Sequence, residues 1–356
     1  MAGPPPSLAA ARNAVRTALA DLAPGARVLV ACSGGADSLA LAVAARDVAP
    51  DAGWQVGAVV VDHRVQAGSG PVAERAATAC RGLGLDPVLV RTVDVGRDGG
   101  PEGAARSARY TALTEAAHEH DAEAVLLGHT LDDQAETVLL GLARGAGTRS
   151  LAGMRARHGL WRRPLLGLRR GDTEAVCAAA GLEPWHDPTN RGRDDDPVRS
   201  RLRSRVMPVL AEVLGPGVPE ALARTAQMLR EDDEHLAEEA RAALVAARIT
   251  GASAPLVLDV GVLGALGAPV RRRAIHRALV EAGVPAGSLS RVHVLEVDRL
   301  LTDWRGQGPV AVPGRHQVSR RCGTLVVERL AARPQADAEP PTAPTPGTTK
   351  HEESDT

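Results

Sequence analysis

Short apolar runs alternate with longer amphipathic stretches through the first half of the chain. The runs predict strands at Arg27–Cys32, Gln55–Val61, Pro87–Val93 and Ala124–Leu127; the stretches predict helices near Asp37–Val48, Val72–Leu83, Glu102–His118 and Leu131–Leu142. Continuous valine and leucine runs suit strands that are buried on both faces of a parallel sheet. The alternation predicts an α/β fold with a doubly wound, mainly parallel sheet, whose ligands bind beyond the carboxyl ends of the strands.

The pattern changes in the second half and becomes mainly helical. Helices are expected at Pro197–Leu210, Pro219–Ile249, Val270–Ala282 and Leu289–Trp304, with a short β unit near Pro309–Val312 and Leu325–Glu328. The expected parts are an N-terminal helix or extension (1–24), the α/β domain (25–212), a smaller, mainly helical domain (213–332) and a tail (333–356). The tail is rich in Pro, Ala, Thr and Glu, so we expect it to be disordered.

Charge is balanced overall but uneven along the chain. The net charge is −1, yet residues 141–210 carry 14 arginines against 7 aspartates and glutamates. Such a local excess can bind RNA while the whole chain stays neutral. Lys350 is the single lysine among 42 basic residues, so arginine must provide any phosphate contact.

The remaining composition points to a cytoplasmic protein without a membrane segment. Residues 1–25 lack the apolar core of a secretory signal, and no run reaches the roughly 20 apolar residues of a membrane span. The four cysteines are widely spaced and are expected to be reduced core thiols. The oligomeric state stays open, with a homodimer among the options.

The segment Ser33-Gly34-Gly35-Ala36-Asp37-Ser38 follows the first strand and opens a helix. The two glycines let the backbone approach an anion, and the helix N-terminus offers free N–H groups, so the segment predicts a pyrophosphate cradle. It is neither a Walker A loop nor a dinucleotide fingerprint. The simpler interpretation is a tight turn with a Ser or Asp cap, but capping needs only one such residue.

A second constellation, Gly128-His129-Thr130-Leu131-Asp132-Asp133-Gln134-Ala135-Glu136-Thr137, also lies between a strand and a helix. Leu131, Ala135, Val138, Leu139 and Leu142 are its expected buried stripe. Its carboxylates cluster near one rim of the first turns, facing the same sheet edge as the serine–glycine loop. Acids at a helix N-terminus are also routine partners of the helix dipole.

These motifs resemble known families. Ser33–Ser38 resembles the PP-loop of the ATP pyrophosphatases, which split ATP between the α and β phosphates. Residues 128–137 resemble the corresponding motif of the tRNA(Ile)-lysidine synthetases, with Thr130 in place of a histidine. The segments 102–110, 185–190 and 199–210 resemble three further motifs of that family, with Ser200 in place of an asparagine.

The resemblance implies a reaction and a set of roles. ATP would adenylate the wobble cytidine of a CAU-anticodon tRNA(Ile), and L-lysine would then displace AMP to form lysidine. Ser33, Gly34, Gly35, Ala36, Asp37 and Ser38 would bind ATP; Asp37 and Asp132 would hold Mg²⁺. Asp133 and Glu136 would bind lysine, with Arg109 on the lysine carboxylate or on the phosphates. All three would join Asp37 and His129 as catalytic residues, with Asp37 as the base. His129 alternatively only orients the turn.

The resemblance also implies tRNA contacts by Arg199, Arg201, Arg203 and Arg205 and by the helical domain. A solvated basic face with internal Arg–Asp pairs is the alternative for these arginines. At the level of function, the alternatives are a tRNA-thiolating PP-loop enzyme, a small-molecule PP-loop synthetase, and a nucleotide- or RNA-binding module without catalysis. Thiolation chemistry usually needs paired cysteines, which this chain lacks.

Overall fold

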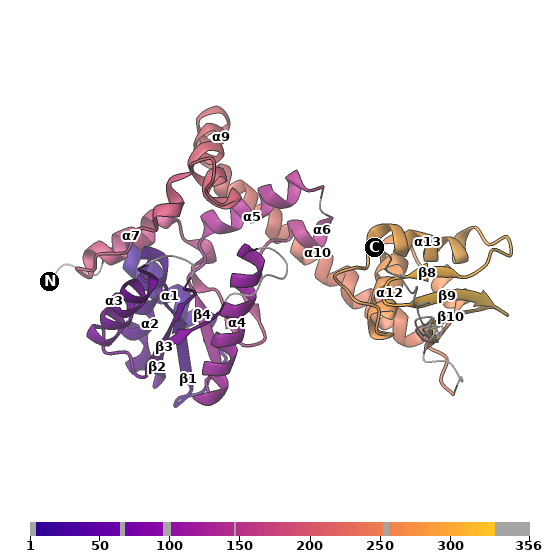
Figure 1. Ribbon diagram of the computed structural model, residues 1–356, viewed down its shortest axis with the longest axis horizontal. Coiled ribbons are helices and arrows are strands. Elements are labelled where there is room, and N and C mark those ends of the chain that lie inside the picture. The colour runs from indigo at the N-terminus through magenta and orange to yellow at the C-terminus, as the bar shows by residue number, and fades with distance from the viewer. Residues whose placement is uncertain (1–4, 65–67, 95–100, 146, 252–255, 332–356) are drawn as a thin grey trace, which may run out of the picture. The chain divides into compact units, whose positions relative to one another are not determined.

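The computed structural model describes residues 5–64, 68–94, 101–145, 147–251 and 256–331. By contacts, the chain divides into two compact units, Met1–Glu234 and His235–Thr356 (Figure 1). The tail for which we expect disorder, 333–356, lies outside the described residues. The domain limits inferred above stay a prediction.

Six strands form the sheet of the first unit, in the order β3-β2-β1-β4-β6-β5. They are β1 Arg27–Ala31, β2 Gln55–Asp62, β3 Val88–Thr92, β4 Ala124–Leu127, β5 Arg157–His158 and β6 Trp161–Arg162. All neighbours pair in parallel except β5 and β6. Ala31 is in register with Val59 and Leu127, so β1, β2 and β4 run to the same edge. The predicted mainly parallel sheet is confirmed.

Helices cover both faces of this sheet (Figure 1). The helices of this unit are α1 Pro6–Ala18, α2 Ala36–Ala52, α3 Ser69–Gly82, α4 Pro101–Glu119, α5 Leu131–Ala143, α6 Thr148–Leu151, the short η1 Pro164–Gly167, α7 Arg170–Ala179 and η2 Pro188–Arg191. Side chains alternate along β1: Val28 and Val30 pack in the cluster built by α1, α2, α3 and α7, whereas Leu29 packs with α4. The core therefore has two layers, one on each side of the sheet.

A long helical stretch follows. It contains α8 Val198–Arg201, the π-helical η3 Leu202–Val206, α9 Met207–Leu214 and α10 Val218–Ala247. The single helix expected over Pro197–Leu210 is thus interrupted, because Pro208 has no N–H to donate to the preceding turn. No single helix in the described part is long and apolar enough to cross a membrane; Val198–Leu214 and Val218–Ala247 meet the length and composition criteria only as a pair bent by 96°.

The second unit has its own sheet and core. Its elements are β7 Leu256–Asp259, α11 Val260–Gly264, α12 Ala268–Glu281, α13 Arg291–Thr302, β8 Val310–Val312, β9 His316–Arg321 and β10 Thr324–Arg329. The sheet is antiparallel, in the order β7-β10-β9-β8. Leu263, Ile275, Leu279, Leu300 and Leu325 are fully buried in its core. The sequence reading missed β7 and β9.

Two side-chain predictions are wrong. Leu142 is 52% exposed, because α5 ends at Ala143 and its last turn leaves the core. Cys322 is exposed, since it lies in the turn between β9 and β10, whereas the other three cysteines are buried as expected.

Candidate active site

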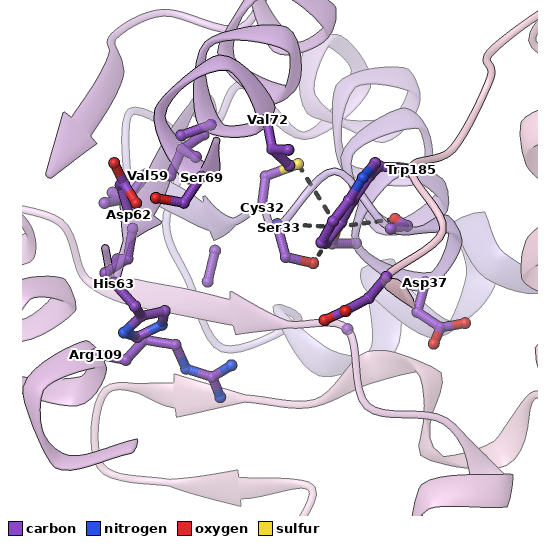
Figure 2. A pocket seen from close by; sticks show the side chains of 18 of the residues that line it. Cys32, Ser33, Asp37, Val59, Asp62, His63, Ser69, Val72, Arg109 and Trp185 are labelled. Atoms are coloured by element: carbon purple, nitrogen blue, oxygen red, sulfur yellow. Dashed lines mark hydrogen bonds between the residues drawn. The ribbon is translucent and has the colours of Figure 1, made fainter. Parts of the chain in front are cut away.

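A cavity of about 680 Å³ lies at the carboxyl ends of β1, β2 and β4 (Figure 2). Its walls include residues at the ends of these three strands: Ser33, Gly35, Asp37 and Ser38 after β1, Asp62 at the end of β2 with His63 after it, and Gly128 and His129 after β4. Motifs far apart in the sequence thus meet at the sheet edge where they were expected.

The loop after β1 is organised around Ser38. The Ser33 N–H donates to Ser38 Oγ over 3.1 Å, and Ser38 Oγ donates to the Gly35 carbonyl over 2.9 Å. Gly34 has a φ of +81°, and a Cβ there would lie 3.1 Å from Ala76 Cβ, so only glycine fits easily. Gly35 caps α2 without a side-chain hydrogen bond, which leaves the N–H groups of the first turn for an anion.

Two neighbours fix this loop from outside. The Trp185 N–H donates to the Gly34 carbonyl over 2.9 Å, and the Trp185 side chain lines the cavity (Figure 2). A Cβ on Gly128 would lie 3.0 Å from the backbone carbonyl of Asp37. The turn after β4 therefore packs directly against the start of α2.

Arg170 brings three of the predicted acids together. Its guanidinium lies 3.7 Å from Asp37 Oδ2, 3.1 Å from Asp133 Oδ1 and 3.7 Å from Glu136 Oε1. Arg203 adds a bidentate pair to Glu136, with Nε–Oε1 at 2.7 Å and Nη2–Oε2 at 3.1 Å. Glu136 is only 1% exposed, and these guanidinium groups are its ion-pair partners in the buried site.

Asp37 lines the cavity, and its surroundings shift its pKa in opposing directions. Burial raises the pKa of Asp37 above its usual range, while the hydroxyl of Thr173, donating over 2.5 Å, and the charge of Arg170 oppose the shift. The nearby charge of Asp133 adds to the rise in this pKa. A carboxylate with a raised pKa is a better proton acceptor.

The two acids at the start of α5 do different things. Asp133 forms a capping box with Thr130, whose N–H donates to Asp133 Oδ2 over 2.8 Å, so one oxygen is structural and the other faces Arg170. Asp132 instead pairs with Arg169 at 3.0 Å and accepts the Arg170 N–H over 2.8 Å. Although burial opposes it, these hydrogen bonds hold the pKa of Asp132 below its usual range.

Arg109 and His129 also line the cavity, and each keeps an unsatisfied nitrogen. Arg109 Nε and His129 Nδ1 are buried without a hydrogen-bond partner among the described residues. Burial, with the charges of Arg109 and Arg163, lowers the pKa of His129 to about 3, so its ring is neutral at pH 7. A buried cation with a free donor, beside a phosphate cradle, is suited to an anion.

Sequence reasoning did not select several lining residues. Trp185, Asp187 and His63 line the cavity, and burial together with the charge of Arg109 lowers the pKa of His63. Arg170 and Thr173, at the start of α7, contact the acids. Trp185 and Asp187 belonged to a recognised motif, but no local pattern indicated Arg170 or Thr173.

The four arginines proposed for tRNA do not form one surface. Arg203 contacts Glu136, as described above, and Arg199 donates to Thr137 Oγ1 over 2.9 Å and lies 3.7 Å from Glu136 Oε2. Arg205 pairs with Asp194 at 2.7 Å, and Arg201 Nε is buried without a partner in the described part of the chain. Two of the four thus face the acids from η3 and α8.

Of the two aspartates expected to hold Mg²⁺, Asp37 is the better placed, because it lines the cavity. No group of three His, Cys, Asp or Glu side chains in the described segments is arranged to hold a metal ion. Mg²⁺ needs only one or two carboxylates when phosphate oxygens and water complete its shell, and Asp37 lies beside the phosphate cradle. Asp132 is less suitable, because Arg169 already occupies both of its oxygens.

The likeness to known proteins covers both units. Residues 9–210 match the model of a PP-loop domain, and residues 258–326 match that of a TilS substrate binding domain. The fold resembles the U34-tRNA thiolase NcsA from Methanococcus maripaludis with its [4Fe-4S] cluster, with a TM-score of 0.53, 18% identity, and coverage of 63% of this chain and 79% of that one.

Relatives named tRNA(Ile)-lysidine synthase align along most of the chain. The relative from Thermobifida fusca is 50% identical over 92% of this chain and 99% of its own length. The relative from Leifsonia xyli subsp. xyli is 56% identical over 85% of this chain and 90% of its own length. The relative from Streptomyces coelicolor is 48% identical over 92% of this chain and 99% of its own. On this extent of identity across both units, the chain belongs to the tRNA(Ile)-lysidine synthase family.

Proposed function

We propose that this chain is a ligase that uses ATP to join L-lysine to C2 of the wobble cytidine in CAU-anticodon tRNA(Ile). The cytosine C2 oxygen attacks the α-phosphorus of ATP and releases pyrophosphate. The ε-amine of lysine then attacks C2, and AMP leaves with that oxygen, so the product reads AUA rather than AUG. The observation that carries the proposal is one cavity that joins an uncapped phosphate cradle, Asp37, and Arg109, whose Nε has no partner among the described residues.

ATP use follows from the family, and the cradle explains it physically. The N–H groups at the start of α2 and the Ser33 hydroxyl are suited to the phosphates, and Arg109 to their charge; Ser38, whose hydroxyl donates to the Gly35 carbonyl, shapes the cradle around ATP. Mg²⁺ would be held by Asp37 and would neutralise charge on the phosphates. Asp132 is the weaker candidate for this role.

The acids around Arg170 are our proposed lysine site. A dibasic amino acid needs carboxylates for its ammonium groups, and Asp133 and Glu136 supply two. Attack on C2 needs a neutral amine, and Asp37, whose pKa is raised by burial, is the proposed base. His129, neutral at pH 7, is suited to hydrogen-bonding the adenylate rather than to carrying charge.

The tRNA contacts remain proposals. Arg201 and Arg205 are the better candidates among the four arginines, because Arg199 and Arg203 lie against Glu136. We assign the mainly helical domain, 213–332, to tRNA as well, which agrees with the substrate-binding model that matches residues 258–326. A homodimer is one further option.

The direct test is incorporation of labelled L-lysine into a transcript of tRNA(Ile) with a CAU anticodon, with ATP and Mg²⁺. A methionine tRNA with the same anticodon is the control. We expect selective labelling that is lost in Asp37→Asn, a variant that keeps the shape of the side chain. Folded protein that labels neither tRNA would overturn the proposal and return attention to thiolation or binding without catalysis.

A further inference from the structure

A second hollow lies on α4, next to the cavity but distinct from it. It encloses about 690 Å³ and is more open than the first. Its wall is formed by α4, by the edge strand β5 and by β6 with the residue after it, through Arg106, Tyr110, Glu115, His158, Trp161 and Arg163. None of the sequence-predicted site residues lines it. We call it the α4 groove.

Aromatic rings gather in this groove although the chain has almost none. One tyrosine and four tryptophans are its only aromatic rings of the Phe, Tyr and Trp types, and two of the five meet here. Tyr110 and Trp161 pack edge to face, with centroids 4.7 Å apart and an interplanar angle of 69°. Both are half-buried, so each keeps ring surface for a ligand.

Positive charge surrounds these rings. The Cζ atoms of Arg106 and Arg109 lie 5.0 and 5.6 Å from the centroid of Tyr110, and Arg106 and Arg163 each donate to its hydroxyl over 3.3 Å. Arg163 is 8% exposed, yet its Nε has no hydrogen-bond partner among the residues that the structure describes. No carboxylate in the described part of the chain forms an ion pair with any of the three arginines. Burying the charge of Arg163 without such a pair is costly unless an anion completes the site.

The groove and the cavity are linked through α4. Arg106 lines the groove and Arg109 lines the cavity, and they are three residues apart on one helix. Arg109 is also close enough to Arg163 for their charges to interact. A ligand that fills both hollows at once must carry repeated anionic groups and flat rings, which describes single-stranded nucleic acid.

We propose that the α4 groove binds an unpaired nucleotide of the tRNA anticodon loop, next to the nucleotide that enters the cavity. Its base stacks on Tyr110 or Trp161, and its phosphate contacts Arg106 from the solvent side and Arg163 from the buried side. The inference rests on the proposed function, because it takes tRNA as the substrate. It adds a site for a neighbouring nucleotide, so the enzyme holds the loop splayed on both sides of Arg109.

The test is binding of a fluorescently labelled CAU anticodon stem–loop RNA to the full chain, followed by anisotropy at several salt concentrations. Trp161→Leu is expected to weaken binding about 5- to 100-fold with an unchanged salt dependence, because it removes stacking alone. Arg106→Gln is expected to reduce the slope of log K against log salt by about 0.7, the value for one lost phosphate contact. Arg75→Gln, which removes an exposed arginine from α3, is the matched control and should change neither.

Kinetics separate this site from the catalytic cavity. Both groove variants should lower kcat/KM for tRNA while KM for ATP stays within about twofold. If Arg106→Gln and Trp161→Leu bind the stem–loop like the wild type, the groove proposal is wrong even when lysine transfer is intact. If the wild type binds the RNA through the groove but transfers no lysine, the proposed function fails and the RNA site stands. Arg106 is exposed, so its variant remains informative should Trp161→Leu fail to fold.

Discussion

The charge of one residue, Arg170, offsets the repulsion among the carboxylates that surround it. Two carboxylates about 4 Å apart repel by on the order of 4 kcal/mol at an effective dielectric constant of about 20. The Arg170 guanidinium lies within 3.7 Å of Asp37, Asp133 and Glu136, and thus offsets several such repulsions at once. An incoming lysine ammonium would enter a site that already stabilises a cation.

The two half-reactions should therefore depend on different acids. Glu136→Gln keeps the size of the side chain but removes its charge, and Arg203 retains Asp133 as a partner at 3.2 Å. We expect KM for lysine to rise at least about tenfold, a loss of about 1.4 kcal/mol, while pyrophosphate release with tRNA changes less than about twofold. Asp37→Asn should lose both steps.

The measurement is single-turnover pyrophosphate release without lysine, followed by lysine transfer over a range of lysine concentrations. An unchanged KM for lysine in Glu136→Gln would remove this residue from the lysine site. Equal losses in both steps would instead point to general damage of the α5 turn.

The pKa of His129 makes a second prediction at the residue scale. Burial lowers this pKa to about 3 in the folded, ligand-free protein, against about 6.5 in the unfolded chain. The ring should stay neutral from pH 8 to pH 5, and folding stability should fall as the pH drops from 6.5 towards 3, because only the unfolded chain gains the proton. The slope is at most about 1.4 kcal/mol per pH unit.

The ring resonances of His129, assigned by difference from His129→Gln, report this directly in an NMR titration. Chemical shifts of a neutral ring down to pH 5 are expected, together with a smaller acid destabilisation in the variant. A midpoint between pH 6 and pH 7 would contradict the prediction. If the ring stays neutral down to pH 5 as predicted, any loss of activity on acidification above pH 5 belongs to a group other than His129.

At the scale of elements, the contact between the turn after β4 and the start of α2 controls the site. A Cβ on Gly128 would lie 3.0 Å from the Asp37 carbonyl, tighter than ordinary packing allows. Gly128→Ala should therefore shift Asp37 by a few tenths of an ångström and lower kcat/KM about tenfold or more. The φ of Gly128 is not positive, so the backbone itself accepts alanine.

The matched control lies in α7, where an added Cβ on Gly171 meets no atom of the described residues within 4 Å. Gly171→Ala should keep activity and raise the free energy of unfolding by about 0.5–1 kcal/mol, since alanine favours the helix. Wild-type activity in Gly128→Ala would show that the α2 start has room to move. Circular dichroism of both variants separates local shifts from unfolding.

Elements also show what sequence patterns can and cannot predict. The strands β1, β2 and β4 are apolar runs, and their shared edge followed from the parallel sheet, so the meeting of the 33–38 and 128–137 motifs was predictable. Strand β9, with the sequence His-Gln-Val-Ser-Arg-Arg, lacks such a run and is a strand because β8 and β10 pair with it. Arg170 and Arg203 reach Glu136 from 34 and 67 residues away, a relation that no local periodicity contains.

At the scale of the whole molecule, the chain holds two separate hydrophobic cores. The clusters around β1 and β2 belong to the first unit, and the cluster around Leu279 and Leu325 belongs to the second. The cavity lies wholly in the first unit, whereas the substrate-binding match lies in the second. A methionine tRNA can share the CAU anticodon, so discrimination against it must use contacts outside the anticodon.

Separate cores predict two thermal transitions, of which ATP should shift only one. A non-hydrolysable analogue with an α,β-methylene bridge, added with Mg²⁺ at 100 times its Kd, stabilises the state that binds it by about 2.7 kcal/mol. For a unit of this size the shift is about 5–10 °C, and the other transition should stay within about 1 °C. Leu279→Ala, at a fully buried position of the second unit, assigns that other transition by lowering its stability by about 2–5 kcal/mol.

A single transition in the calorimeter, moved by both the analogue and the Leu279 variant, would mean that the two cores unfold cooperatively. In that case ATP binding in the first unit would also stabilise the second before any tRNA arrives.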